Sequence, residues 1–397
     1  MKILCVFGEH QYGKPSLGVG TEFAAFIPAL RKLGHDVVHF ESWNRARYKD
    51  FADLNRALLA AVDRERPQVL FASHQLYEIW TETLAALKAR NDLVTINWCT
   101  DDSWKYREVS RFIGPHYHAM VTTDPDVIPA YHRDGIEGVL LSQWAARDDS
   151  LLAPIPAQAC KHAVTFVGAA HGNRRERVAR LREAGVEIEC FGNGWPSGPI
   201  AVERIPEIMQ TSVISLNFAN SSGHNQIKAR TFEVPGAGGF LLTEEAPHLD
   251  RWFERGREIE VFRDDAELAK KVQYYLANPS VRDSIAIAGH ERTRREHTYA
   301  VRLEAVLRCA LEGWRRGAVG IPDGVAKPPK VPFEAHRMGL ALSAIRTVMI
   351  WAGKMIWGPR RGPRAARRAA FEVCWRLAGK RTFGAAGWPG RMFYEYT

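Results

Sequence analysis

Three charged side chains stand close together in the segment NQIKARTFEVPGAGGFLLTEE. Lys228 and Arg230 are positively charged, and Glu233 follows them. On one helix, side chains two residues apart point in nearly opposite directions, so both cations can face one ligand only where a loop passes into a helix. Unpaired backbone N–H groups at such a boundary favour an anion. The segment therefore indicates either a phosphate site or an Arg230–Glu233 surface pair worth roughly 0.3 kcal/mol.

A second candidate for phosphate binding is the loop AAHGNRRER. Gly172 and Asn173 precede a predicted helix whose first turn carries Arg174 and Arg175. Cations at a helix N-terminus oppose the helix dipole, so a bound anion would relieve an unfavourable arrangement. A solvated basic helix with Glu176 as ion partner explains the pattern equally well.

Glycines follow the first charged segment and are predicted to end its helix. Gly236, Gly238 and Gly239 lack the Cβ that would hinder close approach of a ligand. We therefore add Gly238 to the predicted ligand-binding set.

The elements that must position these groups alternate between strand and helix. Strands are expected at residues 2–8, 37–42, 68–73, 93–98, 120–124 and 138–143, with helices at 21–36, 54–64 and 79–89. A second series has strands at 163–168, 186–192, 213–219 and 239–243, with helices at 174–185, 206–210, 228–234 and onwards to 314. Parallel strands require crossover helices, so the pattern predicts an α/β fold with mainly parallel sheets.

A proline-containing segment, APIPAQACKHA, interrupts the alternation and marks a domain boundary. We expect a Rossmann-like domain at 1–155, a second at 160–318, and a helical segment at 331–397. The two domains are doubly wound and are expected to face a cleft, with ligands at the carboxyl ends of the strands.

Charge is distributed unevenly along the 397 residues. The net charge is +9, and residues 331–397 alone contain 12 Lys or Arg and three Asp or Glu, so the rest of the chain is balanced. A nucleic-acid-binding body, which needs a basic patch on the folded domain, is thereby excluded. The six cysteines show no CxxC pattern and the N-terminal apolar run is too short for a secretory signal, so we expect a cytoplasmic protein.

The basic C-terminal segment contains MGLALSAIRTVMIWAGKMIW, which has the length of a membrane span. Arg346 and Lys354 argue against a span. Helical spacing puts these two with Gly339, Ser343 and Thr347 on one side, opposite Ala341, Ile345, Val348, Ala352 and Met355. Together with the following arginines, this predicts a helix lying on an anionic inner membrane. The alternative is that the segment packs against the first domain.

A family resemblance is carried by an ordered series of motifs. KARTFEVPGAGGFLLTEE is followed by LDRWFERGREIEVFRDDAELAKKVQYYL and by IAGHERTRREHTYAVR. From about residue 164 to 302, the series resembles the donor half of CgeB-type glycosyltransferases, which have the GT-B fold and a donor domain like that of group 1 glycosyl transferases. The first half resembles GT-B acceptor domains only in its order of elements.

The resemblance implies an activity and a set of ligands. It implies a glycosyltransferase of hexosyltransferase type that uses a UDP- or GDP-sugar as substrate, with no cofactor and no metal. By the resemblance, Glu233 would accept hydrogen bonds from the ribose. By the charge pattern described above, Gly172, Asn173, Arg174, Lys228 and Arg230 would lie at the nucleotide. The acceptor would be a glycan or a lipid-linked molecule in surface polysaccharide or glycoconjugate assembly. A non-catalytic nucleotide-sugar-binding protein, or a hydrolase or epimerase with the same fold, remains an alternative.

An inverting transferase also needs a base that takes the acceptor proton. Side chains that follow predicted strands and could serve are Glu9, His10, Glu22, His74, Asp101 and Asp102. From these we select His10 and Asp101 as the predicted catalytic residues. The two acidic residues in TDDS could also bind a metal or cap a helix. The paired glutamates of retaining GT-B enzymes are not intact, because Asn225 stands eight residues before Glu233, so the stereochemical outcome stays open.

Overall fold

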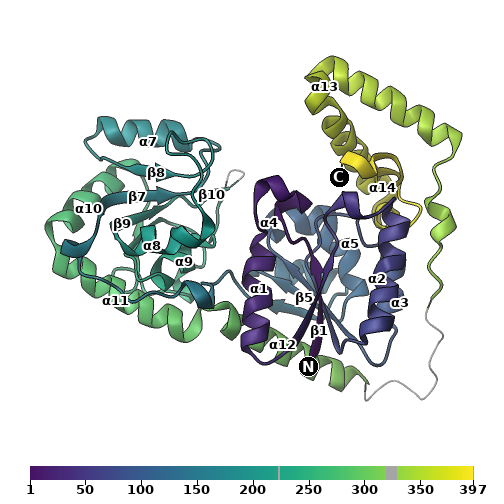
Figure 1. The fold of residues 1–397 in the computed structure, drawn as a ribbon, viewed down its shortest axis with the longest axis horizontal. Coiled ribbons are helices and arrows are strands. Elements are labelled where there is room, and N and C mark those ends of the chain that lie inside the picture. Colours follow the sequence, from purple (N-terminus) through teal and green to yellow (C-terminus); the bar gives the residue numbers. More distant parts are fainter. Residues whose placement is uncertain (222–223, 319–328, 397) are drawn as a thin grey trace. The chain divides into compact units, whose positions relative to one another are not determined.

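The computed structural model describes residues 1–221, 224–318 and 329–396 (Figure 1). The chain forms two compact units, Met1–Gln143 with Leu303–Thr397, and Trp144–Arg302. Each unit is built on a parallel β-sheet of six or five strands that is covered by helices. The predicted α/β class with two doubly wound sheets is confirmed.

The sheet of the first unit has the strand order β2-β1-β3-β4-β5-β6. Its strands are β1 (Lys2–Phe7), β2 (Asp36–Glu41), β3 (Val69–Ala72), β4 (Val94–Cys99), β5 (Ala119–Thr122) and β6 (Val139–Leu141). Its helices before the second unit are α1 (Thr21–Lys32), α2 (Phe51–Glu65), α3 (Thr81–Lys88), α4 (Asp102–Lys105), α5 (Arg111–Ile113) and α6 (Ile128–Arg133). The strand order reverses between β1 and β3, and in open α/β sheets the loops at the carboxyl ends of such strands bind ligands.

The sheet of the second unit has the order β13-β12-β9-β7-β8 and reverses between β9 and β7. Its strands are β7 (His162–Val167), β8 (Glu189–Phe191), β9 (Ser212–Asn217), β12 (Leu241–Glu244) and β13 (Glu260–Phe262). Its helices are α7 (Arg174–Glu183), α8 (Ile205–Gln210), α9 (Arg230–Gly236), α10 (Asp265–Ala277) and α11 (Pro279–Glu296), and a short antiparallel pair is formed by β10 (Asn220–Ser221) and β11 (His224–Asn225). The loops that leave β7 and β9 at their carboxyl ends are those that contain the predicted phosphate-binding residues.

The boundary between the units differs from the predicted one. Residues 144–159 belong to the second unit because their backbone is hydrogen-bonded within it. The N–H of Ala146 donates to the carbonyl of His297, that of Leu152 to Gly236, and that of Ala157 to Asp283. The prolines therefore lie in a segment that runs over the second unit, and the boundary comes earlier, at Gln143.

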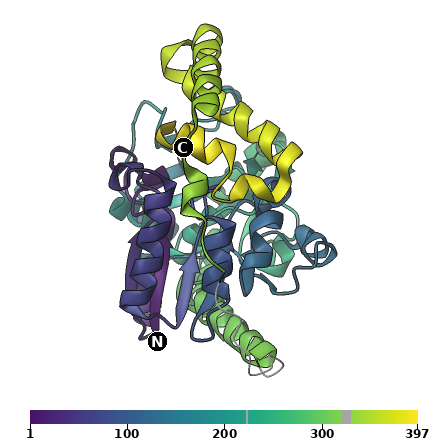
Figure 2. The ribbon, with the colours of Figure 1, turned by 90° about the vertical axis from the view of Figure 1, so that its right-hand side faces the viewer.

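The C-terminal segment is part of the first unit rather than a separate domain. It follows α12 (Tyr299–Ala318) and contains α13 (Leu340–Ala378) and α14 (Trp388–Phe393). Phe371, Trp375 and Phe383 enter the core that β1, α2 and α3 build. Figures 1 and 2 show the bend of α13 projecting away from that core. The packing alternative therefore holds for the later part of the segment. Within the described residues, one helical stretch, Phe333–Phe383, is long and apolar enough to cross a membrane by length and composition alone.

Candidate functional site

Two arginines meet where the strand order of the second unit reverses. Arg230 is the first residue of α9, and its Nε donates to the carbonyl of Val167 at the end of β7, 3.0 Å away. Arg174 is the first residue of α7, and its guanidinium donates to the carbonyl of Phe218, which follows β9, at 3.4 Å. It also donates to the carbonyl of Ala169 at 3.0 Å. Each side chain thus crosses to the chain that leaves a neighbouring strand.

The positive charges of these arginines disfavour one another. Burial, and next the positive charge of Arg174, lowers the pKa of Arg230 to about 10. Burial lowers the pKa of Arg174, and Glu244 opposes this effect. Arg230 has an ion pair with Glu233, whereas no ion pair joins Arg174 to a carboxylate in the described part of the chain. A bound anion would favour both charged forms.

The predicted boundary between loop and helix is confirmed at α9. Lys228 lies in the loop, where its Nζ donates to Oε1 of Gln226 at 2.7 Å, and the helix begins at Arg230. The Arg230–Glu233 pair also forms, but its side chains are only 26% and 24% exposed. The ion pair of the alternative interpretation is therefore present, and it is partly buried rather than fully solvated.

The loop before α7 has the backbone conformation that its sequence suggests. Gly172 has φ +62°, and Asn173 occupies the N-cap position without capping the helix through its side chain. The guanidinium of Arg175 donates to the carbonyl of Gly194, so it does not share the carbonyl acceptors of Arg174. Arg177, further along α7, is buried between Glu244 and Asp265. The alternative of a solvated basic helix thus fits Arg175 and Glu176, which are exposed, better than Arg174, which is half-buried.

The glycines after Glu233 have a packing role in the structure. A Cβ on Gly238 would lie 2.6 Å from the carbonyl oxygen of Leu152, and its φ of +72° also favours glycine. A Cβ on Gly236 would lie 2.5 Å from that of Ala146. These glycines admit residues 146–154 close to α9, and this contact between distant segments was not visible in the local sequence.

The two predicted catalytic residues, His10 and Asp101, follow different strands of the first unit. Asp101 follows β4 at the N-cap of α4. His10 follows β1, where one ring nitrogen lies within 4.8 Å of a carboxylate oxygen of Glu9 and one of Glu41. The carboxylate of Glu41 already accepts three backbone N–H groups, including that of Trp43 at 2.7 Å. This acidic group is therefore explained by loop structure and assigns no metal.

Glu22, which the sequence analysis considered but did not select, has a better-defined environment. It lies in the first turn of α1, directly after the glycine-containing loop. Burial raises the pKa of Glu22, and the negative charge of Asp101 also raises it, whereas Lys105 lowers it. Its place after that loop was the available sequence signal. The raised pKa makes Glu22 a stronger proton acceptor than an exposed glutamate.

Two other candidate bases serve the structure. Asp102 is buried and accepts hydrogen bonds from Ser110 at 2.6 Å and Tyr131 at 2.7 Å. His74 is buried, and its Nε2 is hydrogen-bonded to the hydroxyl of Tyr117.

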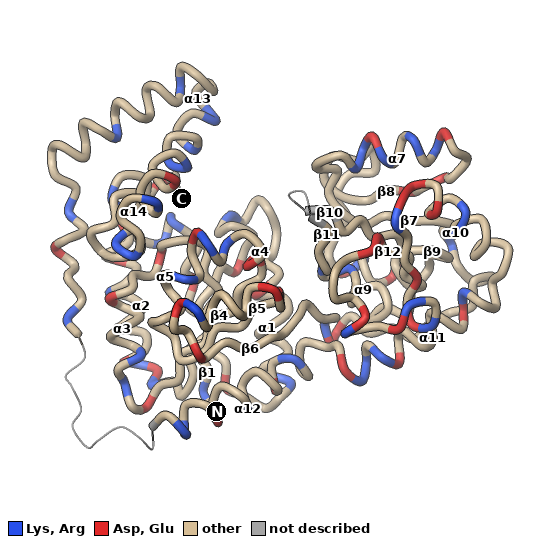
Figure 3. The backbone as a smooth tube through the Cα atoms, turned by 180° about the vertical axis from the view of Figure 1, so that it is seen from behind, with Lys and Arg blue, Asp and Glu red and all other residues tan. Residues whose placement is uncertain are grey.

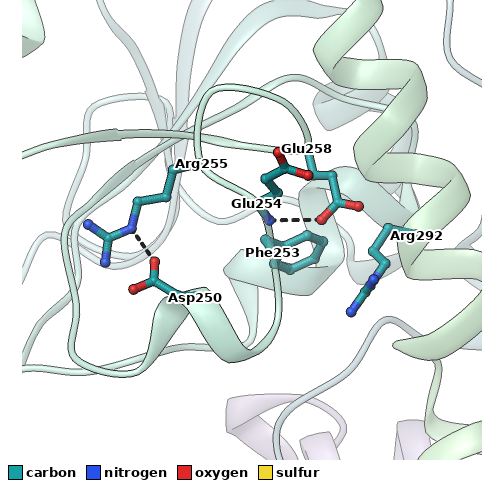
Figure 4. A pocket seen from close by; sticks show the side chains of 6 residues that line it. All are labelled: Asp250, Phe253, Glu254, Arg255, Glu258 and Arg292. Carbon is teal, nitrogen blue, oxygen red and sulfur yellow. Dashed lines mark hydrogen bonds and ion pairs between the residues drawn. The ribbon is translucent and has the colours of Figure 1, made fainter.

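A pocket of about 350 Å³ lies elsewhere in the second unit (Figure 4). The residues that line it are Asp250, Phe253, Glu254, Arg255, Glu258 and Arg292. Arg255 pairs with Asp250 at 2.5 Å, and Glu258 accepts the N–H of Glu254 at 2.8 Å. Glu254 and Arg292 also have ion partners, in Arg257 and Glu296. We therefore assign the pocket no ligand.

Comparisons with known proteins agree with the fold. Residues 174–308 match the family described as "Glycosyl transferase-like". A search of curated proteins found no relative of the sequence. Sucrose-phosphate synthase from Thermosynechococcus elongatus is 11% identical with a TM-score of 0.56, over 81% of this chain and 100% of that one.

Two further solved structures have the same architecture. A glycosyltransferase from Rickettsia africae is 11% identical with a TM-score of 0.53, over 79% of this chain and 98% of that one. HepE from Anabaena in complex with UDP is 11% identical with a TM-score of 0.52, over 80% of this chain and 100% of that one. The chain therefore has the GT-B fold, and its residues 174–308 are similar to the glycosyl transferase-like family.

Proposed function

We propose that the protein transfers a sugar, of the hexose type, from a UDP- or GDP-sugar to a glycan or lipid-linked acceptor. The observation that carries this proposal is the meeting of Arg174 and Arg230 at the β7–β9 reversal, where positive charge is concentrated and a carboxylate neutralises only one side chain. HepE structures that contain UDP or UDP-glucose support the choice of ligand. We place the reaction in the cytoplasm, in surface polysaccharide or glycoconjugate assembly.

The arginines would act on the leaving group. In the transfer, a bond forms between the acceptor oxygen and the anomeric carbon while the bond from that carbon to the phosphate oxygen breaks. Negative charge then grows on the departing nucleoside diphosphate, and the sugar acquires oxocarbenium character. Arg174 and Arg230 supply fixed positive charge for that phosphate, and Lys228 lies close by in sequence. In this proposal no cofactor or metal takes part.

For the proton of the acceptor hydroxyl, we propose Glu22 as the base, with Asp101 beside it. A carboxylate whose pKa is raised holds a proton more strongly, and Glu22 is such a group. His10 stays a second candidate, because it lies in the loop after β1. Glu233 would exchange its contact with Arg230 for hydrogen bonds from the ribose.

The test is release of free UDP or GDP from a panel of nucleotide sugars, with and without glycan and lipid-linked acceptors. We expect release that depends on an acceptor, persists in a metal chelator, and is lost in an Arg174→Gln/Arg230→Gln variant. Arg204→Gln removes an exposed charge from the same unit and is the matched control. Tight binding of UDP without any turnover would favour the non-catalytic alternative.

A further inference from the structure

The first arm of α13 turns its apolar side chains outwards. α13 bends at Gly358, where φ is +77°, so residues 340–357 form a separate helical arm. The large apolar side chains of this arm are highly exposed: Leu340 93%, Ile345 48%, Val348 63%, Trp351 64%, Met355 71%, Ile356 67% and Trp357 54%. Single exposed apolar residues are common, but a contiguous set on one element marks a binding surface.

All of these large side chains except that of Trp357 share one helical face, which we call the apolar face. It comprises Leu340, Ala341, Ala344, Ile345, Val348, Trp351, Ala352, Met355 and Ile356, and no charged residue. The opposite side contains Arg346, which pairs with Glu395 at 2.8 Å. A helix on the surface of a soluble protein normally places its charged side outwards. Here the arrangement is reversed, because the mixed side faces the protein.

The arm is held in place by the rest of the C-terminal segment. Leu342, Met349 and Ile350 pack against Ala366, Ala370, Met392 and Phe393. At the bend, a Cβ on Gly353 would lie 2.4 Å from the carbonyl oxygen of Gly362, so two glycines allow the arms to approach closely. Beyond it, Arg368 pairs with Glu108 at 3.3 Å. The outward direction of the apolar face is therefore fixed by tertiary contacts.

Positive charges lie around the bend, next to the apolar face. They are Lys354, Arg360, Arg361, Arg364 and Arg367, and no ion pair joins any of them to a carboxylate in the described part of the chain (Figure 3). Burial lowers the pKa of Lys14 of the first unit, and the nearby positive charges of Arg364 and Arg367 lower it further. The surface thus combines an apolar face with clustered cations that have no acidic partners.

We propose that this surface docks on an anionic lipid bilayer, with the apolar face at the level of the acyl chains and the cations at the headgroups. The exposed Trp351 of the apolar face suits the interface between headgroups and acyl chains. Self-association through the same face would bring two sets of cations together, which opposes a second copy as the occupant. The sequence predicts that residues 331–397 lie on an anionic membrane, and this proposal adds that residues 340–357 are the part that inserts. It does not depend on sugar transfer.

Co-sedimentation of the full chain with vesicles tests the proposal. We expect binding to phosphatidylglycerol vesicles that weakens with salt, and much weaker binding to phosphatidylcholine vesicles. Replacing Val348, Met355 and Ile356 together by Ser should weaken binding by at least about tenfold, because these side chains supply the inserted surface. The matched control replaces Tyr274, Leu276 and Ile287, which are exposed apolar residues of the second unit, by Ser.

Two further measurements separate the outcomes. Brominated lipids should quench tryptophan fluorescence in the parent, and Trp351→Phe should reduce that quenching. Equal vesicle binding by the two triple variants would overturn the proposal. So would a parent that binds no vesicles but forms a dimer that the Val348, Met355 and Ile356 variant converts to a monomer, since the face would then be a protein interface.

Discussion

Replacement of Arg230 by Gln should separate nucleotide binding from folding stability. The pKa of Arg230 falls from its ordinary 12.5 to about 10, which corresponds to about 3 kcal/mol against the charged form in the free protein. Gln keeps a donor that can reach the carbonyl of Val167 but removes the charge. We therefore expect the loss of the ion pair with Glu233 to be offset, and the free energy of unfolding to change by less than about 1 kcal/mol.

Binding of UDP should respond much more strongly. A charge-assisted hydrogen bond to a phosphate contributes about 1.5–3 kcal/mol, so the dissociation constant should rise by about 10- to 100-fold. Titration calorimetry gives the binding constant, and urea unfolding followed by circular dichroism gives the stability. Arg204→Gln, which removes an exposed charge, should leave both values unchanged.

Either of two results would refute this reasoning. If Arg230→Gln binds UDP as tightly as the parent, the phosphate does not lie at Arg230. If the variant loses several kcal/mol of stability, the charge of Arg230 supports the fold and is not held there for a ligand.

Three other changes test neighbouring features. Glu22→Gln should abolish transfer while leaving UDP binding intact. In the parent, kcat/KM should rise with pH through a pKa above the ordinary 4.5, because a base acts only when it is deprotonated. A variant with an unchanged pH profile would exclude Glu22 as the base. Gly238→Ala should lower the free energy of unfolding by about 1–3 kcal/mol without changing the dissociation constant for UDP, as thermal melts and calorimetry would show, since its Cβ would meet the backbone of Leu152. Burial, and next Arg302, lowers the pKa of His297 to about 4, so the unfolded chain takes up a proton near pH 6.5 while the folded chain does not. Stability should therefore fall by up to about 3 kcal/mol between pH 6.5 and 4, and His297→Gln should reduce that loss in urea titrations at each pH.

Much of the fold follows from local sequence patterns. The strand Lys2–Phe7 and the start of α9 at Arg230 are set by apolar runs and by a change from loop to helix, both of which are properties of a few adjacent residues. Arg174 and Arg230 could likewise be predicted as phosphate-binding residues, because cations at the start of a helix oppose the helix dipole unless an anion binds there. That they meet could not be read locally, because it depends on the order in which β7 and β9 pair.

The features that the sequence patterns missed depend on contacts between distant segments. The packing of Gly238 against the backbone of Leu152 is one such contact. Our proposal of Glu22 as the base likewise needed the structure, which places Asp101 near it. In the C-terminal segment, the amphipathic spacing could be predicted from the sequence. The outward direction of its apolar face could not, because it depends on contacts with distant residues.

The division of the chain has a consequence for its synthesis. The first unit consists of Met1–Gln143 and Leu303–Thr397, so the second unit is inserted within it. Phe371, Trp375 and Phe383 complete a core that begins with Leu4 and Val6. On the ribosome, the second unit has all its residues once Arg302 has emerged, whereas the first strand of the chain must wait for helices made near the end. We infer that the second unit folds first, and that the incomplete first unit is the state from which nascent chains aggregate.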